Sequence, residues 1–204
     1  MDEDTNKKTL ESYEQGVELY NAASLPITGS VKDWIDASLA LLPSGAHILE
    51  LGSAHGRDAD YIETKGFKVD RTDAVQAFVD YLKSQNKDAR LLNALTNDYG
   101  GPYDMIYANA VLLHFTPEQT KTVLQKVYNA LKPHGLFSFS VKIGDDSAWS
   151  EAKLNAPRYF TYWREQPLKE LLTDAHFDIV YWKEAQSGHT SESWYHVIAR
   201  RYKY

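Results

Sequence analysis

The 204-residue sequence contains no cysteine. Disulfide bonds, thiolate nucleophiles and cysteine-ligated zinc are therefore excluded together. Long apolar runs are also missing: no stretch approaches the roughly 18 residues of a membrane-spanning helix, so we expect no such helix. Residues 1–8 are acidic and polar and lack the apolar segment of a secretion signal. These absences predict a cytoplasmic protein.

Basic residues are in the minority. The chain has 22 Lys and Arg against 28 Asp and Glu, which gives a net charge of -6 and a pI near 5.6. This balance argues against the broad basic surface that nucleic acid or an anionic membrane requires. It does not exclude a local basic groove. We therefore expect a small-molecule partner, no membrane partner, and either a monomer or a homodimer. No two histidines have the i, i+4 spacing of a helical zinc site, and no metal is predicted.

Helical spacing of apolar residues marks the N-terminal part of the chain. The spacing from Leu10 to Tyr20 predicts a first helix. A second helix is expected to begin at Ser30, which forms an S-x-x-D capping pair with Asp33, and to stop at residues 43–45.

From residue 47 onward, predicted strands and helices alternate. The expected strands are 47–51, 67–72, 89–92, 103–108, 136–142, 177–183 and 194–201. The expected helices are 57–65, 74–85, 117–131 and 167–175. The helix at 117 has a capping box, because Thr116 precedes Pro117 and Gln119 follows at the third helical position. Residues 132–135 are predicted as its exit turn and 143–163 as a loop or insertion.

This alternation is typical of an α/β fold. It predicts a doubly wound, Rossmann-like sheet of seven strands, mostly parallel, with helices on both faces. The two consecutive strands at the end predict an antiparallel addition at one edge. In such a fold, ligands bind at the carboxyl ends of the strands.

The loop after the first predicted strand is the most informative segment. It reads Glu50-Leu51-Gly52-Ser53-Ala54-His55-Gly56-Arg57. A dinucleotide fingerprint would need glycine at 52, 54 and 57, but Ala54 and Arg57 stand at two of these positions. The bulky Arg57 is incompatible with the close helix–strand contact of that pattern, and the sequence has no G-K-[ST] phosphate loop. The loop therefore favours a ligand without a pyrophosphate.

Residues 47–58 resemble motif I of class I S-adenosylmethionine-dependent methyltransferases, in which an acid precedes three alternating glycines. Gly52 and Gly56 match the first and last glycines, and Ala54 replaces the middle one. The resemblance implies S-adenosylmethionine as cofactor and S-adenosylhomocysteine as product. It also implies that Glu50 contacts the cofactor's amino group, directly or through water. A surface charge at a strand end is the alternative for Glu50.

The ends of the next three strands supply further candidates. Asp73 lies about 20 residues beyond the glycine loop, the spacing of an acid that binds ribose hydroxyls; it could instead cap the following helix. The resemblance implies that Asn93, Ala94 and Leu95 surround the adenine, with the Asn93 carbonyl as acceptor, and that Asn109 lies beside the methionine part. The expected cofactor contacts are Glu50, Gly52, Ala54, Gly56, Arg57, Asp73, Asn93, Ala94, Leu95 and Asn109.

Candidates on the substrate side carry weaker patterns. His114 could act as a general base, or could be a structural histidine bonded to a backbone carbonyl. The expected substrate contacts are Tyr13, Tyr20, Trp149, Arg158 and Tyr159. The two tyrosines belong to an N-terminal helix that could cover the cofactor as a lid. The other three belong to an aromatic segment that could wall the substrate, with Arg158 pairing an anion, or form a packed flap.

The predicted function is S-adenosylmethionine-dependent methylation of a small molecule. The alternatives are methylation of RNA or protein, and a catalytically inactive S-adenosylmethionine-binding protein, which the departures at Ala54 and Asn93 would favour. We expect one domain over residues 1–204. Within it, residues 1–42 form a helical cap, 46–142 the cofactor-binding core, and 143–204 the substrate-side loop, helix and final strands.

Overall fold

The structure is a computed structural model that describes residues 4–187 and 191–202. Its strands are β1 His47–Leu51, β2 Lys68–Asp73, β3 Ala89–Leu91, β4 Tyr103–Ala108, β5 Leu131–Lys142, β6 Ser147–Ser150, β7 Arg158–Thr161, β8 Phe177–Gln186 and β9 Ser193–Arg201. Its helices are α1 Thr5–Gln15, α2 Val17–Ala22, α3 Gly29–Leu39, α4 Arg57–Thr64, α5 Gln76–Ser84, the 3-10 turn η1 Leu112–His114, α6 Pro117–Ala130 and α7 Glu165–Asp174.

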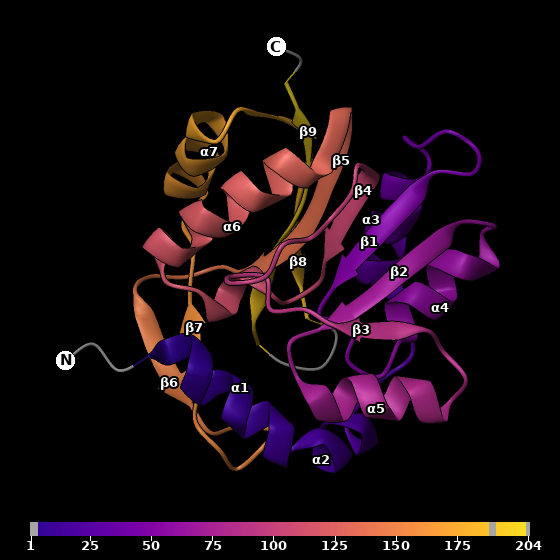
Figure 1. The fold of residues 1–204 in the computed structure, drawn as a ribbon. Coiled ribbons are helices and arrows are strands. Elements are labelled where there is room, and N and C mark those ends of the chain that lie inside the picture. The colour runs from indigo at the N-terminus through magenta and orange to yellow at the C-terminus, as the bar shows by residue number, and fades with distance from the viewer. Residues whose placement is uncertain (1–3, 188–190, 203–204) are drawn as a thin grey trace.

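A seven-stranded sheet in the order β3-β2-β1-β4-β5-β9-β8 forms the centre of the molecule (Figure 1). The strands from β3 to β5 are parallel, and β9 runs antiparallel to both of its neighbours. The predicted fold class is therefore confirmed. The single antiparallel strand lies one place inside the edge, because β8 pairs outside it.

Hydrophobic residues alternate between the two faces of the sheet, as expected for strands covered on both sides. In β1, Ile48 packs with the buried residues of α3 and α4, whereas Leu49 and Leu51 pack with those of α6 and α7. On the α3 side, Trp34 is fully buried and stacks on Tyr107 with ring centroids 4.9 Å apart. The carboxyl ends of β1, β2, β3 and β4 are thereby held at one rim.

The N-terminal segment differs from its prediction in two ways. The single helix expected from Leu10 to Tyr20 is divided at Gly16, which ends α1 and precedes α2. The helix α3 begins one residue before Ser30, with Thr28 at its N-cap and no side-chain capping bond. The predicted capping role of Ser30 is therefore wrong, because Ser30 lies within the first turn.

Two segments predicted as irregular are strands. Residues 132–135 belong to β5, which follows α6 directly and shifts register against β4 between Tyr103 and Met105. Within 143–163, β6 and β7 pair antiparallel as a separate two-stranded sheet. Figure 1 shows this hairpin beside α1, and the two are joined by the hydrogen bond from the Tyr159 N–H to Thr9 Oγ1 at 3.0 Å.

The capping box at α6 gives a test of local stability. Thr116 accepts a hydrogen bond from the Gln119 N–H, and the Gln119 side chain accepts one from the Thr116 N–H. Thr116→Ala removes one of these bonds and is expected to lower the free energy of unfolding by about 1 kcal/mol in urea titrations. Thr122→Ala, on the exposed middle of the same helix, is the control. Equal destabilisation by both would contradict the cap.

Candidate active site

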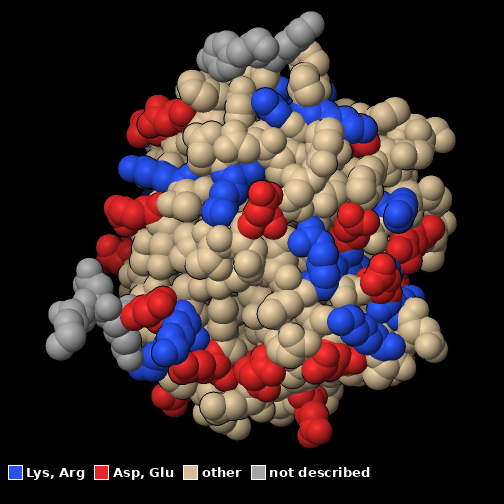
Figure 2. All heavy atoms as spheres, in the orientation of Figure 1, with Lys and Arg blue, Asp and Glu red and all other residues tan. Residues whose placement is uncertain are grey.

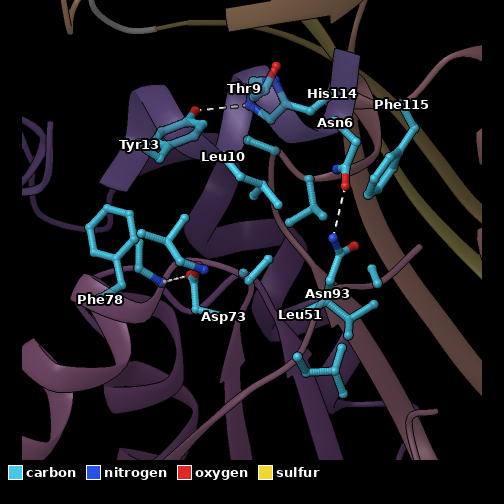
Figure 3. A pocket seen from close by; sticks show the side chains of 18 of the residues that line it. Asn6, Thr9, Leu10, Tyr13, Leu51, Asp73, Phe78, Asn93, His114 and Phe115 are labelled. Carbon is cyan, nitrogen blue, oxygen red and sulfur yellow. Dashed lines mark hydrogen bonds between the residues drawn. The ribbon is translucent and has the colours of Figure 1, made fainter. Parts of the chain in front are cut away.

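A cavity of about 700 Å³, its open mouth included, lies at the carboxyl ends of β1, β2, β3 and β4. Figure 3 shows the α1 side chains Thr9, Leu10 and Tyr13 on one side of it and Leu51, Asp73 and Asn93 on the other. The lining residues are Asn6, Thr9, Leu10, Tyr13, Tyr20, Leu51, Gly52, Ala54, Asp73, Ala74, Val75, Phe78, Leu92, Asn93, Ala94, Asn109, Ala110, Val111, His114 and Phe115. Its size and largely apolar wall are typical of a small-molecule pocket.

The glycine loop leaves β1 with left-handed backbone at Gly52 (φ 72°) and Ala54 (φ 46°). A Cβ at Gly52 would lie 2.6 Å from Val111 Cγ2, so this position excludes a side chain. Ala54 lines the cavity but Gly56 does not; Gly56 begins α4 with φ 88° and faces Leu82. The absence of a side chain at Gly52 thus allows the loop to pass close to Val111, and Gly56 allows the turn into the helix.

Asp73 lies at the end of β2 and lines the cavity. Its carboxylate accepts hydrogen bonds from the backbone N–H of Ala54 at 2.8 Å and of Val75 at 2.9 Å. Burial raises the pKa of Asp73 to about 6, and these backbone bonds limit the rise. The helix N-cap is Val75, so Asp73 closes a turn before the helix, while its remaining lone pairs face a cavity that could hold hydroxyl groups.

Asn93 lies across the cavity from Asp73, at the end of β3. Its side-chain carbonyl accepts the Leu95 N–H at 2.9 Å, and its amide donates to Asn6 of α1 at 2.8 Å. Asn93, which is predicted to accept a hydrogen bond from adenine, therefore already stabilises the local turn and contacts the N-terminal helix. Ala94 lines the cavity, but Leu95 does not and packs against the hydrophobic core.

Glu50 is buried with 2% of its surface exposed, which overturns the alternative of a surface charge. It does not line the cavity. Its Oε2 has no hydrogen-bond partner among the described residues. Burial, followed by repulsion from Asp58, raises the pKa of Glu50 to about 8. A buried carboxyl group with an unpaired oxygen two residues before Gly52 is a place where a cationic amine would be stabilised.

Arg57 does not line the cavity. It donates to Asp58 at 2.7 Å and to the backbone carbonyl of Leu25 at 3.1 Å, so it fastens the segment after α2 to the start of α4. Asp58 also accepts from Asn109 at 2.7 Å. Asn109, which lines the cavity, accepts in turn from Ser140 at 2.7 Å. These hydrogen bonds hold Asn109 at the cavity, whereas Arg57 does not line the cavity.

His114 lies in η1 with both ring nitrogens bonded. Its Nδ1 is 2.7 Å from the Tyr159 carbonyl, which can only accept, so Nδ1 carries the proton. Its Nε2 then accepts from the Tyr13 hydroxyl at 2.9 Å. Burial lowers the pKa of His114 to about 3. The hydrogen bond to a backbone carbonyl matches the alternative of a structural histidine. The only basic nitrogen of the ring already accepts a hydrogen bond from Tyr13.

The structure separates the predicted substrate residues. Tyr13 and Tyr20 line the cavity, whereas Trp149, Arg158 and Tyr159 do not. Trp149 is 38% exposed and packs on Tyr159 in the hairpin. Arg158 is buried and donates to the Tyr13 hydroxyl at 3.2 Å.

Sequence reasoning missed several lining residues on α1, α5 and the turn after β4. The missed residues are Asn6, Thr9, Leu10, Val75, Phe78, Val111 and Phe115. The apolar residues at helical spacing in α1 could have indicated Leu10. The other residues could not be found in this way, because the segments that face one another across the cavity are far apart in the sequence.

The distribution of charged side chains and of possible metal ligands further limits what the site can bind. Acidic and basic side chains are interspersed over the face in Figure 2. Within residues 4–187 and 191–202, no group of three His, Asp or Glu is placed to hold a metal ion. No helix in the same ranges has the length and apolar character needed to cross a membrane.

The sheet order and the cavity at its carboxyl rim define a class I methyltransferase fold. A protein-family model described as a methyltransferase domain matches residues 27–181. The chain therefore belongs to the methyltransferase-domain family, and the predicted class I S-adenosylmethionine-dependent methyltransferase family is confirmed.

Individual proteins resemble the chain more distantly. An uncharacterized methyltransferase from Synechocystis is 28% identical over 115 residues, which cover 55% of this chain and 53% of that protein. The match thus spans about half the length of that relative. A methyltransferase structure from Methanosarcina mazei has a TM-score of 0.72 at 16% identity, covering 88% of this chain and 100% of the other. A 1,6-didemethyltoxoflavin-N1-methyltransferase from Burkholderia thailandensis has a TM-score of 0.74 at 21% identity, covering 97% and 87%.

Gly52→Ala tests the close approach of the loop. The clash with Val111 and the left-handed backbone are expected to destabilise the fold by about 1–3 kcal/mol. Val111→Ala removes the clashing Cγ2, so Gly52→Ala should cost less in the Val111→Ala background. Urea unfolding of the two single variants and the double variant measures this coupling. Additive effects would contradict the contact.

The tautomer of His114 is testable by ¹⁵N NMR of the imidazole. At pH 5 the ring is expected to remain neutral, with the proton on Nδ1, because its pKa lies near 3. Unfolded histidine titrates near 6.5, so the stability contributed by neutral His114 is present above about pH 6.5 and is lost as the pH falls toward 3. Tyr13→Phe should shift the Nε2 resonance by removing its donor. A protonated ring at pH 5 would contradict the arrangement.

Proposed function

We propose that this protein transfers the methyl group of S-adenosylmethionine to a small-molecule acceptor. The observation that carries the proposal is the cavity in which Asp73, the turn from Gly52 to Ala54, and the ends of β3 and β4 face one another. Strand ends at one rim of an α/β sheet are where nucleoside-containing ligands bind. Family membership supports the same cofactor.

The residues present fit this cofactor. Asp73 offers a carboxylate to ribose hydroxyls, and Leu92 and Ala94 offer an apolar surface for the adenine. The unpaired oxygen of Glu50 lies behind the turn where a cationic amino group would bring positive charge. Among the described residues, no Lys or Arg lines the cavity, which disfavours a pyrophosphate-bearing ligand. S-adenosylmethionine supplies an activated methyl group; the protein's part is to bind, align and exclude water.

The N-terminal helix supplies the exclusion of water. The amide of Asn93 reaches Asn6 of α1, and Glu14 accepts a hydrogen bond from the Ala77 N–H at 3.1 Å. Tyr13 and Tyr20 complete this wall. A cofactor must enter past these contacts, so we propose that α1 acts as a lid.

Tyr13 and His114 form a hydrogen-bonded pair at the cavity wall. The Tyr13 hydroxyl donates its one hydrogen to His114 and accepts from Arg158, so its remaining lone pair can only accept, from an N–H or O–H of the ligand. The pKa of His114 is lowered to about 3 and its Nε2 already accepts from Tyr13, so His114 is a weak base; this favours an acceptor that needs little help from one. The hydroxyl of Tyr13 is the group we assign to orient such an acceptor.

A small-molecule acceptor is favoured because α1 covers the cavity. The Burkholderia thailandensis enzyme is a fold neighbour whose structure contains the small heterocycle 1,6-didemethyltoxoflavin and S-adenosylhomocysteine. An RNA or protein acceptor would need a groove open enough to admit a polymer. The mixed charge of the face in Figure 2 gives no basic track for RNA there.

Calorimetric titration with S-adenosylhomocysteine tests the cofactor assignment. The wild-type protein is expected to bind it, and Asp73→Ala to weaken binding at least tenfold, since a charge-assisted bidentate contact is worth about 1.5–3 kcal/mol. Asp88→Ala removes an exposed carboxylate of the same chain and should leave affinity unchanged. Circular dichroism checks that each variant is folded. Failure of the folded wild type to bind would overturn the proposal.

The pH dependence of the same titration is a second test. Only the ionised Asp73 can accept from two hydroxyls, and its pKa in the free protein is about 6. Affinity for S-adenosylhomocysteine should therefore fall as the pH drops from 7 through 6 toward 5. Asp73→Asn should flatten this profile. A wild-type profile that is flat from pH 7.5 to 5 would contradict ribose binding by Asp73.

A further inference from the structure

The loop of the β6–β7 hairpin, residues 151–157, packs on the junction of α1 and α2. The Leu154 side chain lies so close to Gly16 that a Cβ there would be 3.1 Å from it. Ser12 donates a hydrogen bond to the Pro157 carbonyl at 2.6 Å. These contacts hold the loop against the helices that carry Tyr13 and Tyr20, and so fix its charged residues near the cavity mouth.

Two cations of this hairpin lie against those tyrosines. Lys153 Nζ is 3.4 Å from the centre of the Tyr20 ring. Arg158 donates to the Tyr13 hydroxyl and to the Ala152 carbonyl, and its guanidinium lies 5.4 Å from the Tyr13 ring centre. Both tyrosines line the cavity. The two cations are therefore one side chain away from the space that a ligand would fill.

Neither cation forms an ion pair with a carboxylate in residues 4–187 and 191–202. By contrast, the neighbouring cations form ion pairs with carboxylates: Arg57 pairs with Asp58 at 2.7 Å, and Lys142 pairs with Glu192 at 2.5 Å. Arg158 is 5% exposed, and its buried Nε has no hydrogen-bond partner in the same ranges. A buried cation without a counter-charge is costly, so the buried Arg158, with the exposed Lys153 on the same hairpin, indicates an anion supplied from outside the chain.

We propose that Lys153 binds a carboxylate group at the Tyr20 side of the cavity mouth. Arg158 adds positive electrostatic potential to this site. The site rests on the proposed function, because a ligand in the cavity has to bring the carboxylate. S-adenosylmethionine has one on its amino-acid part, and no cation lines the described cavity to receive it. The methyl acceptor is the other possible source.

The state of Lys153 agrees with such a site. Partial desolvation of its ammonium, followed by repulsion from Arg158 and Arg57, lowers the pKa of Lys153 to about 8. An arriving carboxylate relieves that repulsion. The ammonium is also at the end of a flexible stem that is exposed in this structure, so it can turn from the Tyr20 ring toward the mouth without repacking the core.

The first arm of the test compares two ligands on Lys153→Met. S-adenosylhomocysteine carries the amino-acid carboxylate, and 5′-methylthioadenosine lacks the whole amino-acid part. If the carboxylate belongs to the cofactor, Lys153→Met should weaken binding of S-adenosylhomocysteine about tenfold by calorimetry, the loss of one charge-assisted contact. Binding of 5′-methylthioadenosine should be unchanged. Lys153→Arg should retain affinity within about threefold, because it keeps the charge.

The second arm asks whether the acceptor supplies the carboxylate. Protein saturated with S-adenosylhomocysteine is titrated with benzoate and with its neutral analogue benzamide. If the site serves the acceptor, the wild type should prefer benzoate, and Lys153→Met should lose this preference while binding S-adenosylhomocysteine normally. Lys121→Met, which removes an exposed lysine of α6, is the matched control in both arms.

The proposal is overturned if Lys153→Met binds S-adenosylhomocysteine like the wild type and the wild type does not distinguish benzoate from benzamide. It is also overturned if both adenosine ligands are weakened equally, because the effect is then unrelated to the carboxylate. Absence of binding of either adenosine ligand to the folded wild type is a different result. That outcome refutes the proposed function itself.

Discussion

The carboxylate of Asp73 accepts hydrogen bonds from two backbone N–H groups that follow different strands, Ala54 after β1 and Val75 after β2. The neighbouring backbone adds the bond from the Ser53 N–H to the Thr72 carbonyl at 2.8 Å. Together these bonds fix the left-handed turn through Gly52 and Ala54, a conformation that costs free energy wherever it is not held. The floor of the cavity at the ends of β1 and β2 depends on this arrangement.

The opposite wall is made by segments distant in sequence. Tyr13 joins α1 to η1 through His114 and to β7 through Arg158. One phenol therefore connects the helix that lines the cavity, the turn after β4, and the hairpin. Because both hydrogen bonds share one hydroxyl group, a small displacement of α1 would break them together. The position of α1 over the cavity and the position of the hairpin charges therefore depend on the same hydrogen bonds.

Much of the fold follows from local patterns. The strand at His47–Leu51 and the strand at Tyr103–Ala108 coincide with their predicted bounds, because short apolar runs covered on both faces have few other solutions. The capping box at Thr116 also forms, since its partners lie three residues apart. The hairpin of β6 and β7 was not predicted. Its strands are four residues each and are stabilised by packing on α1, which no pattern within 143–163 specifies.

By itself, the sequence determined the α/β class, the glycine turn, and the presence of Asp73 and Asn93 at successive strand ends, because each depends on residues near one another in the chain. Only the tertiary structure decided that Arg57 faces the α2 segment, that Glu50 is buried outside the cavity wall, and that His114 is occupied by Tyr13. It also decided that Arg158 and Lys153 have no counter-charge among the described residues. Burial and pairing of charge depend on what other segments bring to the same place, and the local spacing of residues carries no record of that.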